Sequence, residues 1–471
     1  MARTPKTGPL LARCATASTM ARRACIRMVR GVPLALATLT TALIPACQGS
    51  DSAPQLAKTA EPIDISKIPV PPADGPKLGA LANLTPIQER PERGSKQIGY
   101  LHAGALVARA EEPVSTDDCA GGWYPIRPRG FVCADQLATT NLEHPTLVAM
   151  SLGPKLEQPL PYTYARVDKS TKLYKRDPKR DQGVVEQRKL PRRAGMAIVG
   201  SWTAQDPSGT ELRLGMLTNG LFVPAADLRA AKPSDFAGVE IGEGKGALPI
   251  AIVVKRGVRR FEYDEKHNDW IKKGELDFHE MIPLTGKYRE KGPAKYWATN
   301  DDDYVRHQDV TTLRRRSQFP DFATGNQKWI DISIITGTSI WYEGKKPVYA
   351  TLVSVGQDRL GDPKETASTA QGDFEVVAKH VTAINLDPKT FTEYYELGDV
   401  PWVLELSSGQ LMHGAYWHDR FGIEHGPGHV AFSPTDAQRL WHWVTPALPT
   451  GWHGVTERPS GEAKTIVRIR K

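Results

Sequence analysis

Four histidines lie within a short segment near the C-terminal end of the chain. Residues 412–434 contain His413, His418, His425 and His429. Three imidazoles can hold a Zn²⁺ ion that activates water, and one imidazole can take a proton from a nucleophile. The segment has no HExxH pattern, and histidines more often pack or stay solvated than bind metal. We therefore expect no metal ion and no cofactor here, and a metal-dependent peptidase using these histidines is the third-ranked function.

The same segment offers no thiol that could act as a nucleophile. The chain has five cysteines, which are Cys14, Cys25, Cys47, Cys119 and Cys133. Residues 134–471 therefore contain none. Ser433 is the nearest hydroxyl, but it precedes Pro434 and a helical pattern, so we expect it to cap a helix rather than to attack a carbonyl.

Short strands and one helix must position these histidines. Isoleucines alternate with polar residues at the start of residues 329–356, which predicts a β-meander with one buried face. Residues 369–384 continue the strand pattern, and residues 401–414 form a strand pair that turns at Ser408 and Gly409. Residues 433–444 are typical of a helix in which Ser433 is the N-cap and Asp436 closes a capping box.

Together, residues 325–456 resemble an L,D-transpeptidase catalytic domain. The segments that carry the likeness are WIDISIITGTSIWYEGKKPVYATLVSVG, TAQGDF, PWVLEL, MHGAYWHDRFG and FSPTDAQRLWHWVTPALPTGWHGV. The resemblance implies a β-sandwich-like domain that acts on peptidoglycan tetrapeptide stems. In that chemistry a thiolate attacks the stem carbonyl, a neighbouring imidazole takes its proton, and backbone N–H groups stabilise the oxyanion. The acyl group then passes to an amine on a second stem and forms a crosslink.

The chain departs from the family at the reacting residues. Members carry His-Gly and, roughly fourteen residues later, Ser-His-Gly-Cys. Aligned on SPTDA, His413 and Gly414 match the first pair, while Pro427 stands at the family histidine position and His429 at the cysteine position. Proline can neither act as a base nor donate a backbone hydrogen bond. An acyl-imidazole formed on a histidine would hydrolyse readily. We therefore expect a vestigial pocket with no intact catalytic residue, made of His413, Gly414, Tyr416, Gly426, Gly428 and His429.

The N-terminal segment 1–46 resembles a bacterial lipoprotein signal. Basic residues precede the apolar run VPLALATLTTALIPA, and Ile44, Pro45, Ala46 and Cys47 stand at the lipobox positions. A transmembrane anchor is the alternative, but the run is shorter than the roughly 20 residues that span a bilayer. Translation could start at Met1, Met20 or Met28. We expect export to the periplasm and lipidation at Cys47, with the outer membrane preferred.

The charge pattern argues against a nucleic-acid partner. The net charge is +8, but seven cations precede Asp51, the first acid, and residues from 47 onward carry 54 basic and 53 acidic side chains. The expected partners are peptidoglycan stems, the membrane through the lipid anchor, and a cell-wall enzyme.

Repeated small β-modules are predicted between the signal and the C-terminal domain. Residues 47–84 form a proline-rich linker, residues 85–140 resemble a bacterial Src-homology-3-type barrel, and echoes of RGFVCADQL indicate modules at 162–232 and 248–315. These modules would bind cell-wall glycan or peptide, or act as spacers. Cys119 and Cys133 flank a predicted two-stranded ribbon, which favours a disulfide in an oxidising compartment. Residues 457–471 remain as a basic tail.

The sequence thus predicts a mainly β, lipid-anchored cell-wall protein. Its leading function is the non-catalytic binding of peptidoglycan stems or of a partner enzyme. The second-ranked function is an active L,D-transpeptidase that uses unconventional residues to form crosslinks by acyl transfer.

Overall fold

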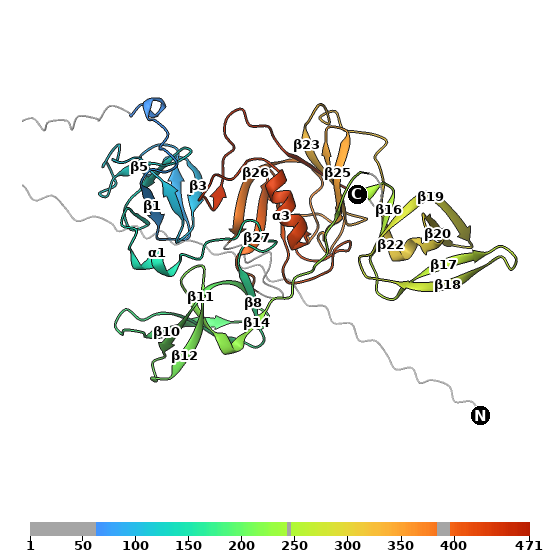
Figure 1. The fold of residues 1–471 in the computed structure, drawn as a ribbon, viewed down its shortest axis with the longest axis horizontal. Coiled ribbons are helices and arrows are strands. Elements are labelled where there is room, and N and C mark those ends of the chain that lie inside the picture. The colour runs from blue at the N-terminus through green and yellow to red at the C-terminus, as the bar shows by residue number, and fades with distance from the viewer. Residues whose placement is uncertain (1–62, 243–245, 384–395) are drawn as a thin grey trace, which may run out of the picture. The chain divides into compact units, whose positions relative to one another are not determined.

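The computed structural model describes residues 63–242, 246–383 and 396–471 (Figure 1). The predicted signal, Cys47 and the first part of the linker lie outside these residues. Strands dominate the described part of the chain, which confirms the mainly β fold class. The helices described there are α1 (Pro145–Ala149), α3 (Pro434–Trp443) and the 3₁₀ turns Ile65–Lys67, Ala225–Asp227 and His307–Asp309. No described helix is long and apolar enough to cross a bilayer.

The first module consists of seven short strands and one disulfide. The strands are β1 (Lys77–Ala80), β2 (Thr85–Gln88), β3 (Gln97–Leu101), β4 (Leu106–Ala108), β5 (Trp123–Pro125), β6 (Phe131–Cys133) and β7 (Ala138–Thr139). Strand β1 lies within the predicted linker and pairs with β4 and β7. Regular secondary structure therefore begins before residue 85, within the predicted linker.

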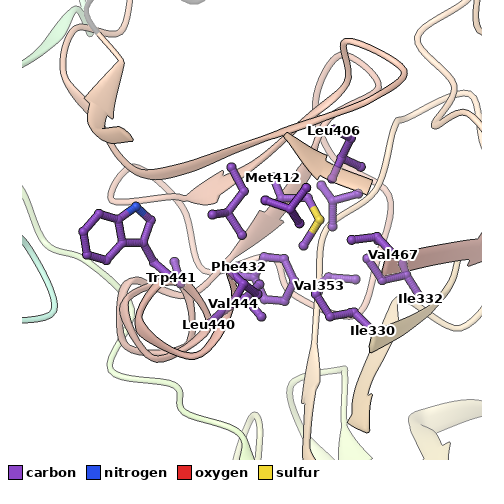
Figure 2. Packing of buried hydrophobic residues seen from close by; sticks show 14 of the residues in the cluster. Ile330, Ile332, Val353, Leu406, Met412, Phe432, Leu440, Trp441, Val444 and Val467 are labelled. Carbon is purple, nitrogen blue, oxygen red and sulfur yellow. The ribbon is translucent and has the colours of Figure 1, made fainter. Parts of the chain in front are cut away.

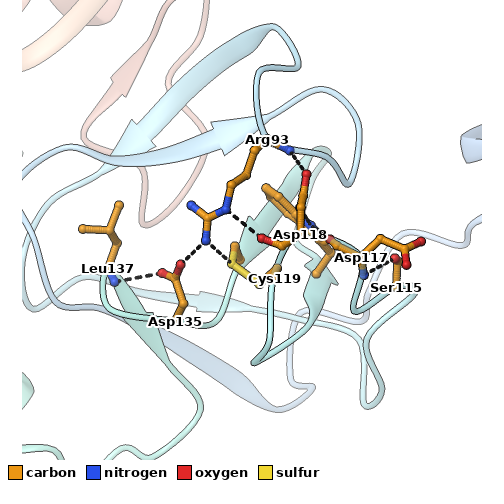
Figure 3. The surroundings of a disulfide bond; sticks show 9 residues. Arg93, Ser115, Asp117, Asp118, Cys119, Asp135 and Leu137 are labelled. Carbon is orange, nitrogen blue, oxygen red and sulfur yellow. Dashed lines mark hydrogen bonds and ion pairs between the residues drawn. A yellow bond between two sulfur atoms is a disulfide. The ribbon is translucent and has the colours of Figure 1, made fainter. Parts of the chain in front are cut away.

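Cys119 and Cys133 form a disulfide with their Cα atoms 5.9 Å apart. Strands β5 and β6 are antiparallel and place Trp123 opposite Cys133. Arg93 lies against the disulfide, with its Nε donating to the Asp118 carbonyl at 2.7 Å and its Nη2 paired with Asp135 (Figure 3). The ribbon therefore brings the two sulfurs together next to a fixed guanidinium.

The second and third modules each form a seven-stranded antiparallel sheet. The second contains β8 (Thr163–Val167), β9 (Thr171–Arg176), β10 (Val184–Leu190), β11 (Gly195–Gln205), β12 (Glu211–Leu217), β13 (Phe222–Pro224) and β14 (Leu228–Ala230). The third contains β16 (Ile250–Val253), β17 (Val258–Asp264), β18 (Asp269–Leu276), β19 (Met281–Lys291), β20 (Ala294–Thr299), β21 (Tyr304–Arg306) and β22 (Val310–Leu313).

The sheets of the second and third modules do not close into barrels. The strand order is β10-β9-β13-β12-β11-β8-β14 in the second module and β18-β17-β21-β20-β19-β16-β22 in the third. In each path the first and last strands do not pair, so the described residues contain no closed barrel. The mainly β fold class with small β-modules is confirmed, and the described residues show no closed barrel among these modules.

The C-terminal domain carries the remaining strands around α3. They are β23 (Lys328–Ser333), β24 (Thr338–Glu343), β25 (Lys346–Leu352), β26 (Gly372–Ala383), β27 (Val400–Leu406), β28 (Leu411–Gly414), β29 (Val430–Phe432), β30 (Gly454–Val455) and β31 (Ile466–Arg470). Strand β15 (Val239–Glu240) adds to β25. The predicted meander and the 401–414 strand pair are confirmed by the antiparallel pairs β23–β24, β24–β25 and β27–β28.

Residues 457–471 are not a basic tail, because they contain β31. This strand lies inside the sheet, parallel to β23 and antiparallel to β26. Val467 and Ile469 are buried. The intervening arginines point to carboxylates on the neighbouring strands, with Arg468 paired to Asp373 and Arg470 to Asp331. The basic residues therefore alternate with core residues, as a strand requires.

The hydrophobic core of the C-terminal domain lies between its sheet and α3 (Figure 2). The predicted helix is confirmed: Ser433 is its N-cap and accepts the Asp436 N–H at 3.1 Å. Leu440 and Trp441 on α3 are buried against strand residues such as Met412. Strands β28 and β29 flank this core. Packing against the core therefore fixes the backbone at the ends of these two strands.

Candidate functional site

Two adjacent parallel strands bring the histidine segment together. Strands β28 and β29 pair in parallel, with Met412 opposite Val430 and His413 opposite Ala431. The loop that joins the strands therefore returns to the end of β28, although about fifteen residues separate the two ends. The ring centroids of His413 and His429 lie 6.1 Å apart and the rings are perpendicular.

A cleft with a volume of about 1150 Å³ opens at this point. The C-terminal domain lines it with residues from three regions, which are the segment after β25, the β27–β28 turn and the β28–β29 loop. The second module adds Arg166 and Arg193. Polar side chains, imidazoles and arginines therefore surround the space in which a ligand would lie.

Hydrogen bonds fix the protonation of the two central histidines. Nδ1 of His413 donates to the Gly414 carbonyl at 3.1 Å, because a carbonyl can only accept. Nδ1 of His429 instead accepts the Leu411 N–H at 3.3 Å, so the neutral ring carries its proton on Nε2. Burial, followed by the nearby His429, lowers the pKa of His413 to about 3. Burial lowers the pKa of His429 to about 4, so both rings are neutral at pH 7.

Comparison with known proteins identifies the domain that holds this cleft. Residues 327–468 match the YkuD family, the L,D-transpeptidase catalytic domain. The chain therefore contains an L,D-transpeptidase-family domain. The match confirms the predicted resemblance and extends past residue 456 to include β31.

Several solved L,D-transpeptidases show a weak overall similarity. The structure from Xylanimonas cellulosilytica is 17% identical over 33% of this chain and 65% of its own, with a TM-score of 0.21. The structure from Stackebrandtia nassauensis is 16% identical over 33% of this chain and 62% of its own, with a TM-score of 0.22. The structure from Mycobacterium smegmatis is 15% identical over 52% and 89%, with a TM-score of 0.23. This chain spans less than two thirds of the first two proteins, and no curated protein matches it.

Most of the predicted pocket residues line the cleft of the L,D-transpeptidase-family domain. Those that do are His413, Gly426, Pro427, Gly428 and His429, together with His418 and His425. That Pro427 and His429 stand at the family histidine and cysteine positions stays a prediction from the sequence alignment.

Two predicted residues support the cleft without lining it. A Cβ on Gly414 would lie 3.1 Å from the Cβ of Ala437, so this glycine lets β28 approach α3 closely. Tyr416 is buried, and its hydroxyl donates to the Gly398 carbonyl at 3.2 Å. Its ring centroid lies 4.3 Å from that of Tyr164 in the second module.

Among the described residues no thiol lines the cleft, whereas the hydroxyl side chains of Thr366, Ser368 and Ser408 do. Cys119 and Cys133 are joined to each other. Ser433 is fully buried and occupied as the cap of α3. Gly428 has φ near +80° and donates its N–H to the Gly426 carbonyl at 3.2 Å. The titratable groups that line the cleft include the four imidazoles and the carboxylates of Asp358, Glu365 and Asp419.

The outer pair of histidines is not arranged as a metal centre. The rings of His418 and His425 are perpendicular with centroids 4.4 Å apart, and Nδ1 of His418 accepts the Arg420 N–H at 3.1 Å. Burial lowers the pKa of both rings. Across residues 63–242, 246–383 and 396–471, no three His, Cys, Asp or Glu side chains are grouped so that they could hold a metal ion.

Sequence reasoning missed much of the cleft lining, including two arginines, a glutamine and the acids Asp358, Glu365 and Asp419. Arg166 and Arg193 come from the second module, and the Gln410 side chain donates to the Gly428 carbonyl. The β27–β28 turn pattern predicted a hairpin but not the direction of Gln410. No local pattern signals the two arginines, because they lie more than 100 residues before the domain whose cleft they line.

Proposed function

We propose that this protein binds peptidoglycan peptide stems in the cleft of its L,D-transpeptidase-family domain without crosslinking them. The observation that carries the proposal is His429, which stands where the family alignment expects the nucleophilic cysteine and faces an open cleft of about 1150 Å³. A cleft that keeps its volume and polar lining, but has no thiol, retains the means to bind a peptide and lacks the means to form a thioester.

The hydrogen bonding of His429 supports the absence of acyl transfer. The Nδ1 lone pair, which would attack a carbonyl, already accepts the Leu411 N–H. Nε2 carries the proton, and a neutral imidazole N–H is a far weaker acid than a thiol. His413 has a pKa of about 3 and is therefore a weak base. His429 would have to break its backbone hydrogen bond before its Nδ1 lone pair could attack a carbonyl.

The place of the protein in the cell belongs to the same proposal. The lipobox-like sequence ending at Cys47 would anchor the chain to a membrane on the periplasmic side, with the outer membrane preferred, and the proline-rich linker would act as a tether. The small β-modules would then hold the cleft within reach of the cell wall. A cell-wall enzyme that acts on the bound stem is the expected protein partner.

The test is to incubate the purified chain with tetrapeptide stems and to follow both binding and products. We expect saturable binding by calorimetry and no new mass by mass spectrometry, with or without a chelator. Crosslinked product would overturn the proposal in favour of an active transpeptidase. Chelator-sensitive cleavage would instead favour a metal-dependent peptidase, and a lack of binding would exclude stems as the ligand.

A matched pair of variants locates the binding in the cleft. Ser408 is exposed in the β27–β28 turn and lines the cleft, so Ser408→Trp is expected to weaken stem binding by filling the space. Ser151 is also exposed and lies outside the cleft lining, so Ser151→Trp is expected to leave binding unchanged. Equal effects of the two variants would place the bound stem elsewhere.

A further inference from the structure

A second, smaller hollow adjoins the cleft and has five cations in its lining. Its volume is about 310 Å³, and it shares Arg166, Arg193 and Trp417 with the cleft, so the two hollows are neighbours. The side chains that bring positive charge to it are Arg166, Arg192, Arg193, Arg229 and Lys232, and we call this set the arginine pocket. All five come from the second module.

Strand pairing places two of these cations directly opposite each other. In the β8–β14 ladder Arg229 pairs with Arg166, so both side chains lie on the same face of the sheet. Like charges at directly opposed positions destabilise a sheet. Arg193 adds a second unfavourable feature, because it adopts φ of +69°, a left-handed conformation that favours glycine. The second module therefore places arginines at this hollow despite charge repulsion between two of them and an unfavourable backbone conformation at a third.

The acidic residues of the lining do not balance this charge. Among the described residues, Asp168 is the one acid that lines the hollow, and its carboxylate pairs with Nε of Arg229 at 2.9 Å. Nη1 of Arg166 donates to the Trp417 carbonyl at 3.4 Å, and its Nε and Nη2 donate to the Arg193 carbonyl at 3.4 and 3.3 Å. These long bonds hold the guanidinium at the border with the cleft. Five cations and one carboxylate in a concave surface focus a positive potential on any ligand that extends out of the cleft.

We propose that the arginine pocket binds the free carboxylates of the peptide stem that occupies the cleft. The planar guanidinium donates two parallel hydrogen bonds to a carboxylate, which a single point charge cannot do. Trp417 lines the same hollow and gives the peptide an apolar surface beside the charges. This inference rests on the proposed function and deepens it, because it makes the protein selective for stems with unmodified acidic groups over amidated stems.

The test compares a tetrapeptide stem whose carboxylates are free with the same peptide fully amidated. The wild-type chain is expected to bind the free acid at least about tenfold more tightly. Raising the ionic strength from about 50 mM to about 300 mM is expected to reduce this preference. Arg166→Gln combined with Arg193→Gln should abolish the preference, whereas the exposed Arg213→Gln on β12 should keep it. Equal affinity for both peptides in the wild type, or an unchanged preference in the double variant, would overturn the inference.

Two further experiments separate a loss of carboxylate binding from misfolding and from a failure of the proposed stem binding. Arg229→Gln with Lys232→Gln changes exposed residues and should also reduce the preference. Citrate serves as a direct carboxylate probe: it is expected to bind the wild type and not the Arg166/Arg193 double variant. If neither peptide binds but citrate does, stem binding fails and the arginine pocket stands. If inorganic phosphate binds more tightly than citrate, the assignment to carboxylates is wrong.

Discussion

His413 and His429 sit 6.1 Å apart with complementary tautomers, one protonated on Nδ1 and the other on Nε2. Nδ1 of His413 donates to the Gly414 carbonyl, and Nδ1 of His429 accepts the Leu411 N–H. Both rings are neutral at pH 7 because burial disfavours the charged imidazolium. The pair therefore presents neutral, polar rings to the cleft.

Restoring the family residues at positions 427 and 429 tests whether the rest of the cleft can still support acylation of a thiol. With His429→Cys and Pro427→His, the alignment places a thiol and an imidazole at the family positions. We expect a thiol that forms a covalent adduct with an acylating inhibitor, detected by mass spectrometry of the peptide containing residue 429. His429→Cys alone should react more slowly, because it lacks the base. A folded double variant that stays inert would show that the rest of the cleft has lost its catalytic geometry as well.

The buried state of His413 predicts how acid affects stability. Its folded pKa of about 3 lies below the unfolded value of 6.5, so the unfolded chain binds more protons between these pH values. The free energy of unfolding should therefore fall with decreasing pH over this range, by about 1.4 kcal/mol per pH unit for one such group. His413→Asn removes this group, so denaturation between pH 7 and pH 4 should show a shallower slope than in the wild type. Equal slopes would contradict the assignment.

Helix α3 joins three elements of the C-terminal domain through one buried carboxylate. Asp436 is fully buried and accepts hydrogen bonds from the Tyr349 hydroxyl at 2.6 Å, the Thr351 hydroxyl and the Gly238 N–H at 2.9 Å. Burial raises its pKa, and these hydrogen bonds act against that rise. The carboxylate therefore ties the first turn of α3 to β25 and to the chain before β15.

Removing this carboxylate should destabilise the domain strongly. Asp436→Ala leaves the Tyr349 hydroxyl and the Gly238 N–H buried without their acceptor, which should cost about 3 kcal/mol in the free energy of unfolding. Thr435→Ala, one residue earlier on the same turn, should change it by less than about 0.5 kcal/mol. Urea denaturation followed by tryptophan fluorescence measures both values. If both variants lower the free energy of unfolding by similarly small amounts, the Asp436 hydrogen bonds contribute little to holding α3 against β25.

Sequence patterns correctly predicted those helices and strands that short stretches of sequence specify. The α3 helix followed from Ser433 and Pro434, and the β27–β28 pair followed from the Ser408–Gly409 turn. The capping-box role given to Asp436 overlooked its tertiary partners on β25. The sequence also did not reveal β31, whose partner strand lies more than 100 residues away and whose arginines resemble a solvated tail. Pairings of this kind depend on tertiary contacts that no local window contains.

At the scale of the molecule, the first module and the C-terminal domain share a core. Strand β30 pairs with β3 through Gly99 and Val455 and with β26 through Lys379 and Val455. Trp452 and Val455 belong to the same hydrophobic cluster as residues of β1, β2 and β3. A Cβ on Gly99 would lie within 2.5 Å of the Trp452 ring, so the glycine makes room for the indole. The first module therefore completes its core with a segment from the far end of the chain.

This shared core predicts that the first module and the C-terminal domain unfold together. Trp452→Ala removes a side chain that is 3% exposed and should lower the free energy of unfolding by about 4 kcal/mol. Because the lost contacts belong to the first module, limited proteolysis should then cut within residues 77–139 and within the C-terminal domain at similar rates. Trp202→Ala in the second module serves as the comparison and should leave the first module protected. If Trp452→Ala exposes only the C-terminal domain to the protease, the first module folds independently of β30, and the indole merely covers its surface.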